Sequence, residues 1–417
     1  GKKIVFLLSD KSLSEEKIQY REGLPILFSV VDRKGFYHIE NGNLIFHDDL
    51  FKSAFYLLSG YQELSPDFLD NKGRYPYSLS IQNKLNVTRK PLVNYYFEKI
   101  YEGLTEYGKS AGLLPEKRRY FNDFCLFLSH DVDRVDTYTF YELGYHVKQV
   151  LGFVKSPFNR LKTFMLTTKF FLNCLNFINR KNPHWDFEYH LETEKKYGFI
   201  STFFFLPKGL LHHDAYYSFR EKRLKELFQL IDKKHCEIGL HGTVRSAKQQ
   251  GIFLENFNEI KKYAKDIKGN RQHRLLFDVN VTPGFYHNAG LLYDTSLGFA
   301  EHEGFRNSYC LPFRLYDHKN DCMLDTWEIP LVVMDVTLFM YRKYDFESAK
   351  ESIRIVLKEV KKFNGIFSLL WHNGNFDETL YPGIRNFYEN LLKDISDMNP
   401  ESLTGSEIIG RINEIKN

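Results

Sequence analysis

From residue 124 to the C-terminus, short apolar segments alternate with longer amphipathic ones, and this alternation constrains the fold more than any other feature. The apolar segments are FCLFLSH (124–130), STFFFLP (201–207), EIGLH (237–241), WEIPLVV (327–333) and GIFSLLWHN (365–373). The amphipathic segments, with helical spacing, are 187–198, 221–235, 254–267 and 345–363. Segments that are apolar on both faces are typical of strands buried on both sides, so the alternation predicts an α/β fold with a parallel sheet covered by helices.

The length of 417 residues predicts two domains. The polar connector LLPEKRRYFND (113–123) is the best boundary, which divides the chain into 1–118 and 119–417. The first part mixes strand-like runs (3–8 and 26–31) with helical stretches (48–64 and 91–108), so we expect a small α/β domain. The second part is long enough for a (β/α) barrel with insertions.

Composition indicates which binding partners and which cellular compartment to expect. The net charge of +4 is small and its basic residues are spread along the chain, so no nucleic-acid partner is expected. Five cysteines without a C-x-x-C pair disfavour a disulfide framework and favour a reducing compartment. The chain shows no transmembrane segment or signal peptide, so a cytoplasmic location is expected, and LTTKFFLNCLNFI (166–178) is interpreted as an amphipathic helix packed on the protein. The sequence does not indicate an oligomeric state.

Polar side chains follow three of the apolar segments. Asp131 and Asp133 come after 124–130, His241 closes 237–241, and His372 follows the run IFSLLW. The carboxyl ends of barrel strands are where functional groups gather, and Asp and His together can hold a divalent cation and move protons. Each residue alone is more often a helix cap or a structural hydrogen-bonding group, but their coincidence favours a metal-assisted hydrolytic site. The pair His212–His213 is interpreted as loop surface.

The order of several motifs resembles the polysaccharide deacetylases, carbohydrate esterase family 4, in a variant with HDVD at the first motif. The motifs are LSHDVDR (128–134), STFFFL (201–206), EIGLHGTVRS (237–246), GNRQHRLLF (269–277), YDTSLGF (293–299) and FSLLWHN (367–373). The resemblance covers the chain from about residue 124 onward. It implies a deformed (β/α) barrel and a metal-dependent deacetylase, with zinc as the default ion.

The resemblance also implies roles for individual residues. Asp131 matches the catalytic base, and Asp133 and His241 match metal ligands. Arg271 matches an arginine that pairs with the base, where a cation would favour the ionised carboxylate that a base requires. His372 matches the general acid on the last strand.

One position departs from the family pattern. The second motif normally carries another histidine four residues after the first, but here Arg245 follows His241, and a guanidinium cannot bind a cation. The best candidate for the third ligand is His273, which lies where the family has its arginine motif. Weaker candidates are Ser246, Thr243 and His130.

The sequence identifies substrate-contacting residues less clearly than it identifies metal ligands. Trp371, with Leu370, would frame an acetyl pocket, although core packing accounts for these two side chains equally well, and Trp327 would form a wall on which a sugar stacks. Arg306 is a candidate substrate contact and as plausibly part of a loop salt bridge.

The charge partner of His372 is a separate expectation. Asp325 is the candidate partner, and Asp335 is interpreted as a turn cap.

The N-terminal region has a resemblance of its own. SAFYLLSGYQEL (53–64), DNKGRYPYS (70–78) and RKPLVNYY (89–96) resemble a small uncharacterised domain that precedes HDVD deacetylases in many bacteria. No chemistry follows from it, and DNKGRY is interpreted as a turn.

The expected substrate is an acetylated oligo- or polysaccharide, as an N- or O-acetylated sugar of a bacterial glycan or its precursor. Two other classes stay open. One is an inactive glycan-binding or scaffolding module on the same fold, which the altered second motif would explain. The other is a glycosidase using Asp131 and Asp133, which is weaker because two short side chains so close together cannot easily span a glycosidic bond.

Overall fold

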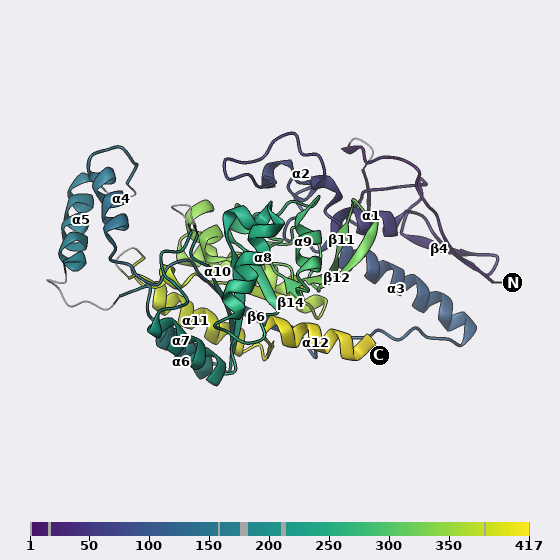
Figure 1. The fold of residues 1–417 in the computed structure, drawn as a ribbon. Coiled ribbons are helices and arrows are strands. Elements are labelled where there is room, and N and C mark those ends of the chain that lie inside the picture. Colours follow the sequence, from purple (N-terminus) through teal and green to yellow (C-terminus); the bar gives the residue numbers. More distant parts are fainter. Residues whose placement is uncertain are drawn as a thin grey trace.

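A curled sheet of ten strands forms the centre of the molecule (Figure 1). The computed structural model describes residues 2–15, 18–156, 159–175, 182–209, 214–378 and 381–416. Nine strands follow the order β11-β12-β10-β9-β8-β7-β6-β14-β13, and β15 pairs with the start of β6, on the edge that β7 joins further along. All neighbours are parallel except β11 and β12, so the expected α/β fold with a deformed (β/α) barrel is confirmed, in the form of an open half-barrel.

The strands of this sheet are short and lie mostly within the buried centre of the molecule. They are β6 (Cys125–Val132), β7 (Ser201–Phe205), β8 (Glu237–Gly242), β9 (Gly269–Gln272), β10 (Tyr293–Asp294), β11 (Phe313–Asp317), β12 (Cys322–Glu328), β13 (Val333–Met334), β14 (Ile366–Leu370) and β15 (Glu401–Ser402). Every residue of β6, β7 and β14 is buried, as the apolar segments predict. The sequence does not predict β9 and β10, because they are short and polar.

The helices of the barrel cover this sheet. They are α6 (Phe187–Lys196), α7 (Lys222–Lys233), α8 (Gln250–Lys261), α9 (Thr282–Asn288), α10 (Phe346–Lys362), α11 (Ile384–Ser396) and α12 (Gly405–Lys416). Their buried residues repeat at helical spacing, as in Ile353, Val356, Leu357 and Val360 of α10, and pack against the strands.

The N-terminal region is a small α/β unit, as expected, with its own apolar core. Its elements are β1 (Ile4–Phe6), β2 (Gln19–Arg21), β3 (Leu24–Ile26), β4 (Tyr37–Glu40), β5 (Asn43–Phe46), α1 (Leu50–Leu58), α2 (Ile81–Lys84) and α3 (Leu92–Ala111). The predicted strand at 26–31 is wrong except at Ile26, the last residue of β3. The domain boundary at 118/119 stays a prediction.

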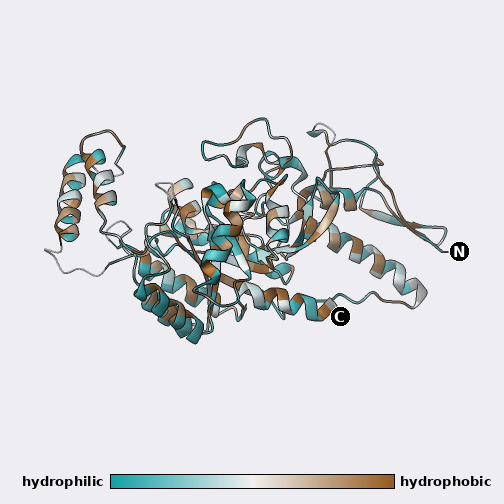
Figure 2. Cartoon of the chain, in the orientation of Figure 1, coloured by the Kyte–Doolittle hydropathy of each residue, from teal (hydrophilic) through white to brown (hydrophobic). Residues whose placement is uncertain are grey.

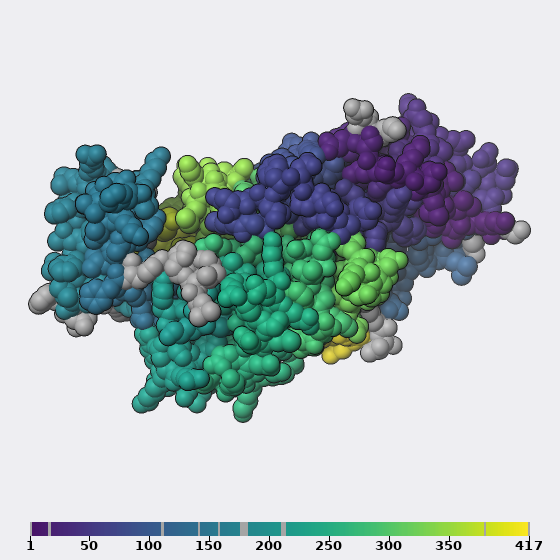
Figure 3. Space-filling view, turned by 45° about the horizontal axis from the view of Figure 1, so that its top comes forward, coloured from purple at the N-terminus to yellow at the C-terminus, as the bar shows by residue number. Residues whose placement is uncertain are grey.

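The N-terminal region lies directly against the barrel (Figure 3), and buried polar contacts join the two. Arg306 Nη2 lies 2.5 Å from Glu63 Oε2, and both side chains are almost fully buried. Gln82 Nε2 donates to the carbonyl of Arg306 at 2.6 Å, and Asn307 Nδ2 donates to the carbonyl of Leu57 at 3.0 Å. Because buried charges are costly unless they are paired, these contacts hold the two regions in one arrangement.

Two helices form an arm that projects from the barrel, α4 (Phe140–Val150) and α5 (Arg160–Cys174) (Figure 1). The segment 166–174 is helical, as expected for 166–178, and within this arm it lies against α4. Residues 176–178, His212 and His213 lie outside the described residues. Within the described ranges, no helix is long and apolar enough to cross a membrane.

Candidate metal centre

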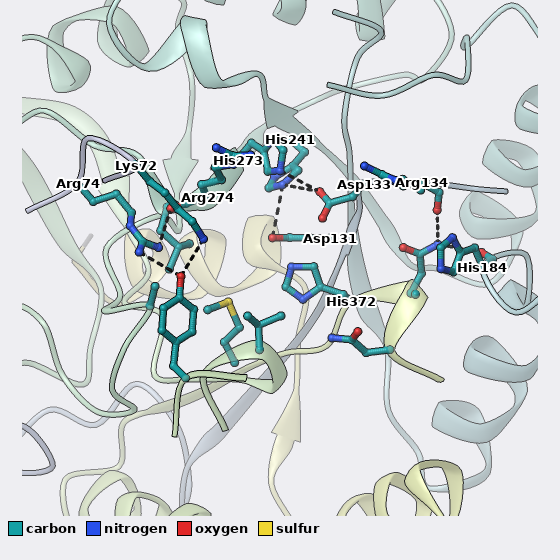
Figure 4. Close-up of a pocket in the computed structure, with 18 residues that line it drawn as sticks. Lys72, Arg74, Asp131, Asp133, Arg134, His184, His241, His273, Arg274 and His372 are labelled. Carbon is teal, nitrogen blue, oxygen red and sulfur yellow. Dashed lines mark hydrogen bonds and ion pairs between the residues drawn. The ribbon is translucent and has the colours of Figure 1, made fainter. Parts of the chain in front are cut away.

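The carboxyl ends of β14, β6, β8 and β9 meet at one edge of the sheet, where β7 lies between β6 and β8. Leu370 of β14 is in register with Ser129 of β6, and His241 of β8 is in register with Arg271 of β9. The strands are parallel, so the residues that follow them emerge on the same side. Figure 4 shows the resulting side chains around one pocket.

Asp133, His241 and His273 offer ligand atoms that all lie within 4.8 Å of one another. Asp133 Oδ1 is 3.3 Å from His241 Nε2 and 3.6 Å from His273 Nε2. These are the three residues that the sequence analysis assigned as ligands. One carboxylate and two imidazoles that face an open pocket fit a divalent cation of the zinc type, which accepts three protein ligands and leaves a position for substrate.

The hydrogen bonds around His241 orient it for this role. Its Nδ1 lies 2.8 Å from the carbonyl oxygen of Arg271, and a carbonyl can only accept, so Nδ1 carries the proton. Nε2 then presents its lone pair to Asp133. Within the described part of the chain, neither His241 Nε2 nor Asp133 Oδ1 has a hydrogen-bond partner, although both atoms are buried. Buried polar atoms without partners are costly, and a bound cation would satisfy both.

Neighbouring imidazoles shift the pKa of Asp133. Burial alone would raise the pKa of its carboxyl group, but the imidazoles of His273, His241 and His372 lower that pKa well below its usual range. The carboxylate form, which metal binding requires, is thus favoured.

Asp131 lies beside the ligands and is held by Arg271. Arg271 Nη1 is 3.0 Å from Asp131 Oδ1 and donates to Ser129 Oγ at 2.9 Å. The guanidinium is fully buried, and its Nε donates to the carbonyl of Thr295. Asp131 Oδ2 is 3.7 Å from His241 Nε2, so one carboxylate oxygen is fixed by the arginine while the other faces the ligand cluster.

His372 pairs with Asp335, so the expected partner Asp325 is wrong. His372 Nδ1 is 2.7 Å from Asp335 Oδ1, and the backbone N–H of His372 donates to Oδ2 at 2.8 Å. Burial alone would lower the pKa of His372, but the charge and hydrogen bond of Asp335, with smaller contributions from Asp133 and Asp131, raise it to about 10. Asp325 is exposed on β12, because alternation along that strand turns it toward solvent.

Asp335 carried a sequence signal that could have identified it. It follows β13 directly, so it occupies the same strand-end position as Asp133 and His372. Asn375 Nδ2 donates to its Oδ2 at 2.7 Å and fixes the carboxylate further.

The other candidates for the third ligand are engaged elsewhere. Arg245 is exposed and donates to Gln249. Ser246 donates to the carbonyl of Thr243, and the Thr243 hydroxyl donates to Asn256. His130 is fully buried, 2.6 Å from Glu194 Oε1, and stacks on Phe203.

The three proposed substrate contacts do not line the pocket. Trp371 is fully buried and packs against Phe376 and Tyr388. Trp327 lies in another core cluster, beneath Arg314. Arg306 forms the buried ion pair with Glu63 described above. Large apolar surfaces contribute most when they are fully buried, which explains why these aromatic rings lie in the core.

The pocket is instead lined by charged and polar side chains together with an apolar patch, and it has a volume of about 380 Å³. The patch consists of Leu275, Ala300, Met334 and Val336. On one side of the ligand cluster lie Lys72, Arg74 and Arg274, and on the other Arg134 and His184 (Figure 4). Lys72 and Arg74 come from the N-terminal region, in the stretch interpreted only as a turn.

Comparison with known proteins gives one family match and several likenesses of fold. Residues 3–109 match a family of unknown function, DUF7033. This match falls in the region that resembles an uncharacterised domain. No curated protein matches the chain.

Solved structures are similar over most of the chain at low identity. A candidate polysaccharide deacetylase from Mycobacterium smegmatis is 16% identical, with a TM-score of 0.45, over 70% of this chain and 91% of that one. The allantoinase Puue is 11% identical, with a TM-score of 0.46, over 74% and 95%. A candidate polysaccharide deacetylase from Pseudomonas aeruginosa PAO1 is 10% identical, with a TM-score of 0.45, over 69% and 90%. With likenesses this weak, residue roles follow only from the geometry of this chain.

Proposed function

We propose that this chain is a metal-dependent hydrolase that removes acetyl groups from an N- or O-acetylated sugar of a bacterial glycan or its precursor. The observation that carries the proposal is the meeting of three groups in one pocket: a ligand set, a buried Asp–Arg pair and a His–Asp pair. Together they supply a cation site, a base and an acid, which are the functions that metal-assisted hydrolysis needs.

Asp133, His241 and His273 would hold the cation. When bound, a divalent ion supplies Lewis-acid polarisation of an acyl group, and zinc suits this donor set. His241 is held in the correct tautomer by the carbonyl of Arg271, so its ligating nitrogen needs no rearrangement.

Asp131 is the proposed base. Arg271 fixes Oδ1, so Oδ2 can take a proton from water without rotation of the carboxylate. Both residues are buried, which keeps the pair in one geometry.

His372 is the proposed acid. Its Nδ1 donates to Asp335, and in the imidazolium form Nε2 carries a second proton, which would pass to the departing amine or alkoxide. The raised pKa of His372 keeps this proton in place at neutral pH. The apolar patch of the pocket could receive an acetyl methyl group.

The test combines metal analysis with acetate release. The purified chain should contain about one equivalent of divalent metal and release acetate from acetylated glycans. Asp133→Ala should lose the metal and the activity together, while Lys265→Gln, an exposed change at the opposite ends of the strands, should retain both.

Two outcomes would contradict the proposal. A chain without metal that releases no acetate but binds glycans would be an inactive binding module. Release of reducing ends in place of acetate would identify a glycosidase.

A further inference from the structure

We infer that the pocket contains an anion-binding subsite, formed jointly by the N-terminal region and the barrel, that recognises a carboxylate or phosphate group on the substrate. The subsite consists of Lys72, Arg74, Arg274 and Tyr341, all of which line the pocket. This inference rests on the proposed function, because it supposes that a substrate occupies the pocket.

The hydroxyl group of Tyr341 has a hydrogen left to donate. Lys72 Nζ donates to its hydroxyl oxygen at 2.9 Å, and Arg74 Nη2 donates to it at 3.2 Å. A tyrosine hydroxyl accepts two hydrogen bonds and donates one, so both lone pairs are used and the O–H remains to be donated. Among the described residues no acceptor takes this hydrogen. A negatively charged oxygen beside two cations would be its strongest acceptor.

The charges around Tyr341 do not balance. Arg74 is paired with Asp70, 2.6 Å from Nη2 to Oδ2, and lies 4.0 Å from Glu301. Lys72 and Arg274 have no carboxylate partner in the parts of the chain that the structure describes. The pocket wall therefore carries surplus positive charge next to an unused hydroxyl donor, and an anionic ligand group fits both.

The backbone presents these side chains through unusual conformations. Arg274 and Leu275 both have left-handed φ values, 64° and 56°, which are costly for side chains of this size. Gly73, between Lys72 and Arg74, has φ 82°, which glycine adopts readily. Tyr341 ends a π-helical turn, Thr337–Tyr341, a rare conformation that is frequently found at functional sites. Three irregular segments thus converge on one surface.

The experiment measures binding of glucuronate and glucose 6-phosphate to the full chain by calorimetry, with glucose as the neutral control. At least one anion should bind about tenfold more tightly than glucose, as expected for charge-assisted hydrogen bonds. Comparison of the two anions distinguishes a carboxylate from a phosphate ligand. Lys72→Gln should remove most of the preference, Lys72→Arg should retain it, and Lys265→Gln should leave it unchanged.

A second variant separates this subsite from the metal centre. Asp133→Asn should retain the anion preference, because Asp133 does not contribute to the cationic wall. Equal binding of glucose and both anions, or a preference lost in Asp133→Asn but kept in Lys72→Gln, would overturn the subsite. Anion preference without acetate release would leave the subsite standing and contradict only the deacetylase proposal.

An independent observation concerns the arm formed by α4 and α5. Of the 28 exposed large hydrophobic side chains in the described part of the chain, 11 lie between residues 140 and 175. Phe153 is 80% exposed and Leu161 71%. In Figure 2 these helices, which stand away from the barrel, contain hydrophobic residues interspersed with hydrophilic ones. Exposed apolar surface gathered in this way marks an interaction site.

The charge of the arm indicates its partner. Between residues 140 and 175 the sequence contains five basic residues and one acidic residue, Glu142, which is ion-paired with Arg134 at the base of the arm. The basic residues are Lys148, Lys155, Arg160, Lys162 and Lys169. A second copy would bring two positive arms together, whereas an anionic lipid surface complements both the charge and the apolar side chains. We propose that the arm docks on an anionic lipid bilayer.

Vesicle co-sedimentation tests this second proposal. The chain should pellet with vesicles of phosphatidylcholine and phosphatidylglycerol mixed in equal parts, and weakly with phosphatidylcholine alone. Phe153→Ser with Leu161→Ser should weaken pelleting at least about fivefold, because two apolar side chains no longer insert. Met323→Ser, at a side chain 70% exposed on β12, is the matched control and should have no effect.

Two results would overturn the lipid proposal. One is unchanged pelleting of the double variant. The other is a dimer in sedimentation velocity that the double variant abolishes, which would make the arm an interface between copies.

Discussion

The two ends of the pocket are built in different ways. The metal-ligand end comes from side chains at the ends of adjacent parallel strands, whose register fixes their spacing. The cationic end combines a turn of the N-terminal region, residues 70–74, with loops at 274 and 341. A single sheet therefore determines the chemistry, whereas the docking of a second region shapes the surface that meets the rest of the substrate.

His372→Ala is expected to have the largest effect, a fall in kcat without a change in metal content. Without the acid, kcat should fall by roughly 10²- to 10⁴-fold. Metal content should stay unchanged, because Asp133, His241 and His273 remain in place. Measured acetate release and metal analysis on the same preparation check both outcomes. A loss of metal in this variant would show that His372 belongs to the ligand set.

Glu63→Gln tests whether the N-terminal region must be fixed in place. The variant leaves the guanidinium of Arg306 buried without its ion-pair partner, so the free energy of unfolding should fall by about 3–5 kcal/mol. Chemical denaturation measures this change. Because Lys72 and Arg74 come from the N-terminal region and the ligands do not, the anion preference of the folded variant should weaken more than its metal affinity.

The sequence predicted the two ends unequally for a physical reason. Asp131, Asp133, His241 and His372 follow apolar strands, and strand pairing places such residues together whatever the loops do. Asp335 has the same position but follows a strand of only two residues, too short for periodicity to show. The contacts of Lys72 and Arg74 with Tyr341 join residues more than 260 apart in the chain, and no local pattern predicts how two regions dock.

Within the metal-ligand end, strand periodicity predicted some of the residues, and only the family resemblance predicted the others. Arg271 and His273 lie on or directly after β9, a short polar strand that periodicity did not predict. They were placed in the site only because their motif resembled a family. Trp327 and Trp371, assigned partly in the same way, lie in the core. Sequence therefore identified the polar residues that meet in the pocket, but not which aromatic side chains remain exposed.

Asp335→Asn should have an intermediate effect that depends on pH. Asp335 makes the largest contribution, ahead of Asp133 and Asp131, to the rise in the pKa of His372 from 6.5 to about 10, so the proton that the proposed acid needs is lost only as the pH rises through that value. Without the carboxylate, the alkaline limb of the kcat profile should move to lower pH. The associated stabilisation is fully present below pH 6.5 in the native chain and is lost as the pH rises toward 10, so the variant should lose stability mainly at neutral and acidic pH. An unchanged alkaline limb would exclude Asp335 as the positioning residue.

Arg245→His should have the smallest effect and tests the ligand set most directly. The substitution restores the histidine of the family motif, so a site that follows the motif would gain a ligand and bind metal more tightly. The Arg245 side chain is exposed and reaches Gln249, whereas His273 already lies 3.6 Å from Asp133. We therefore expect metal affinity to change by less than about twofold, the range of most surface substitutions. His273→Ala is the matched comparison, and it should lose metal binding even in the Arg245→His background. Rescue of the His273→Ala variant by Arg245→His would instead place the third ligand at the motif position and exclude His273.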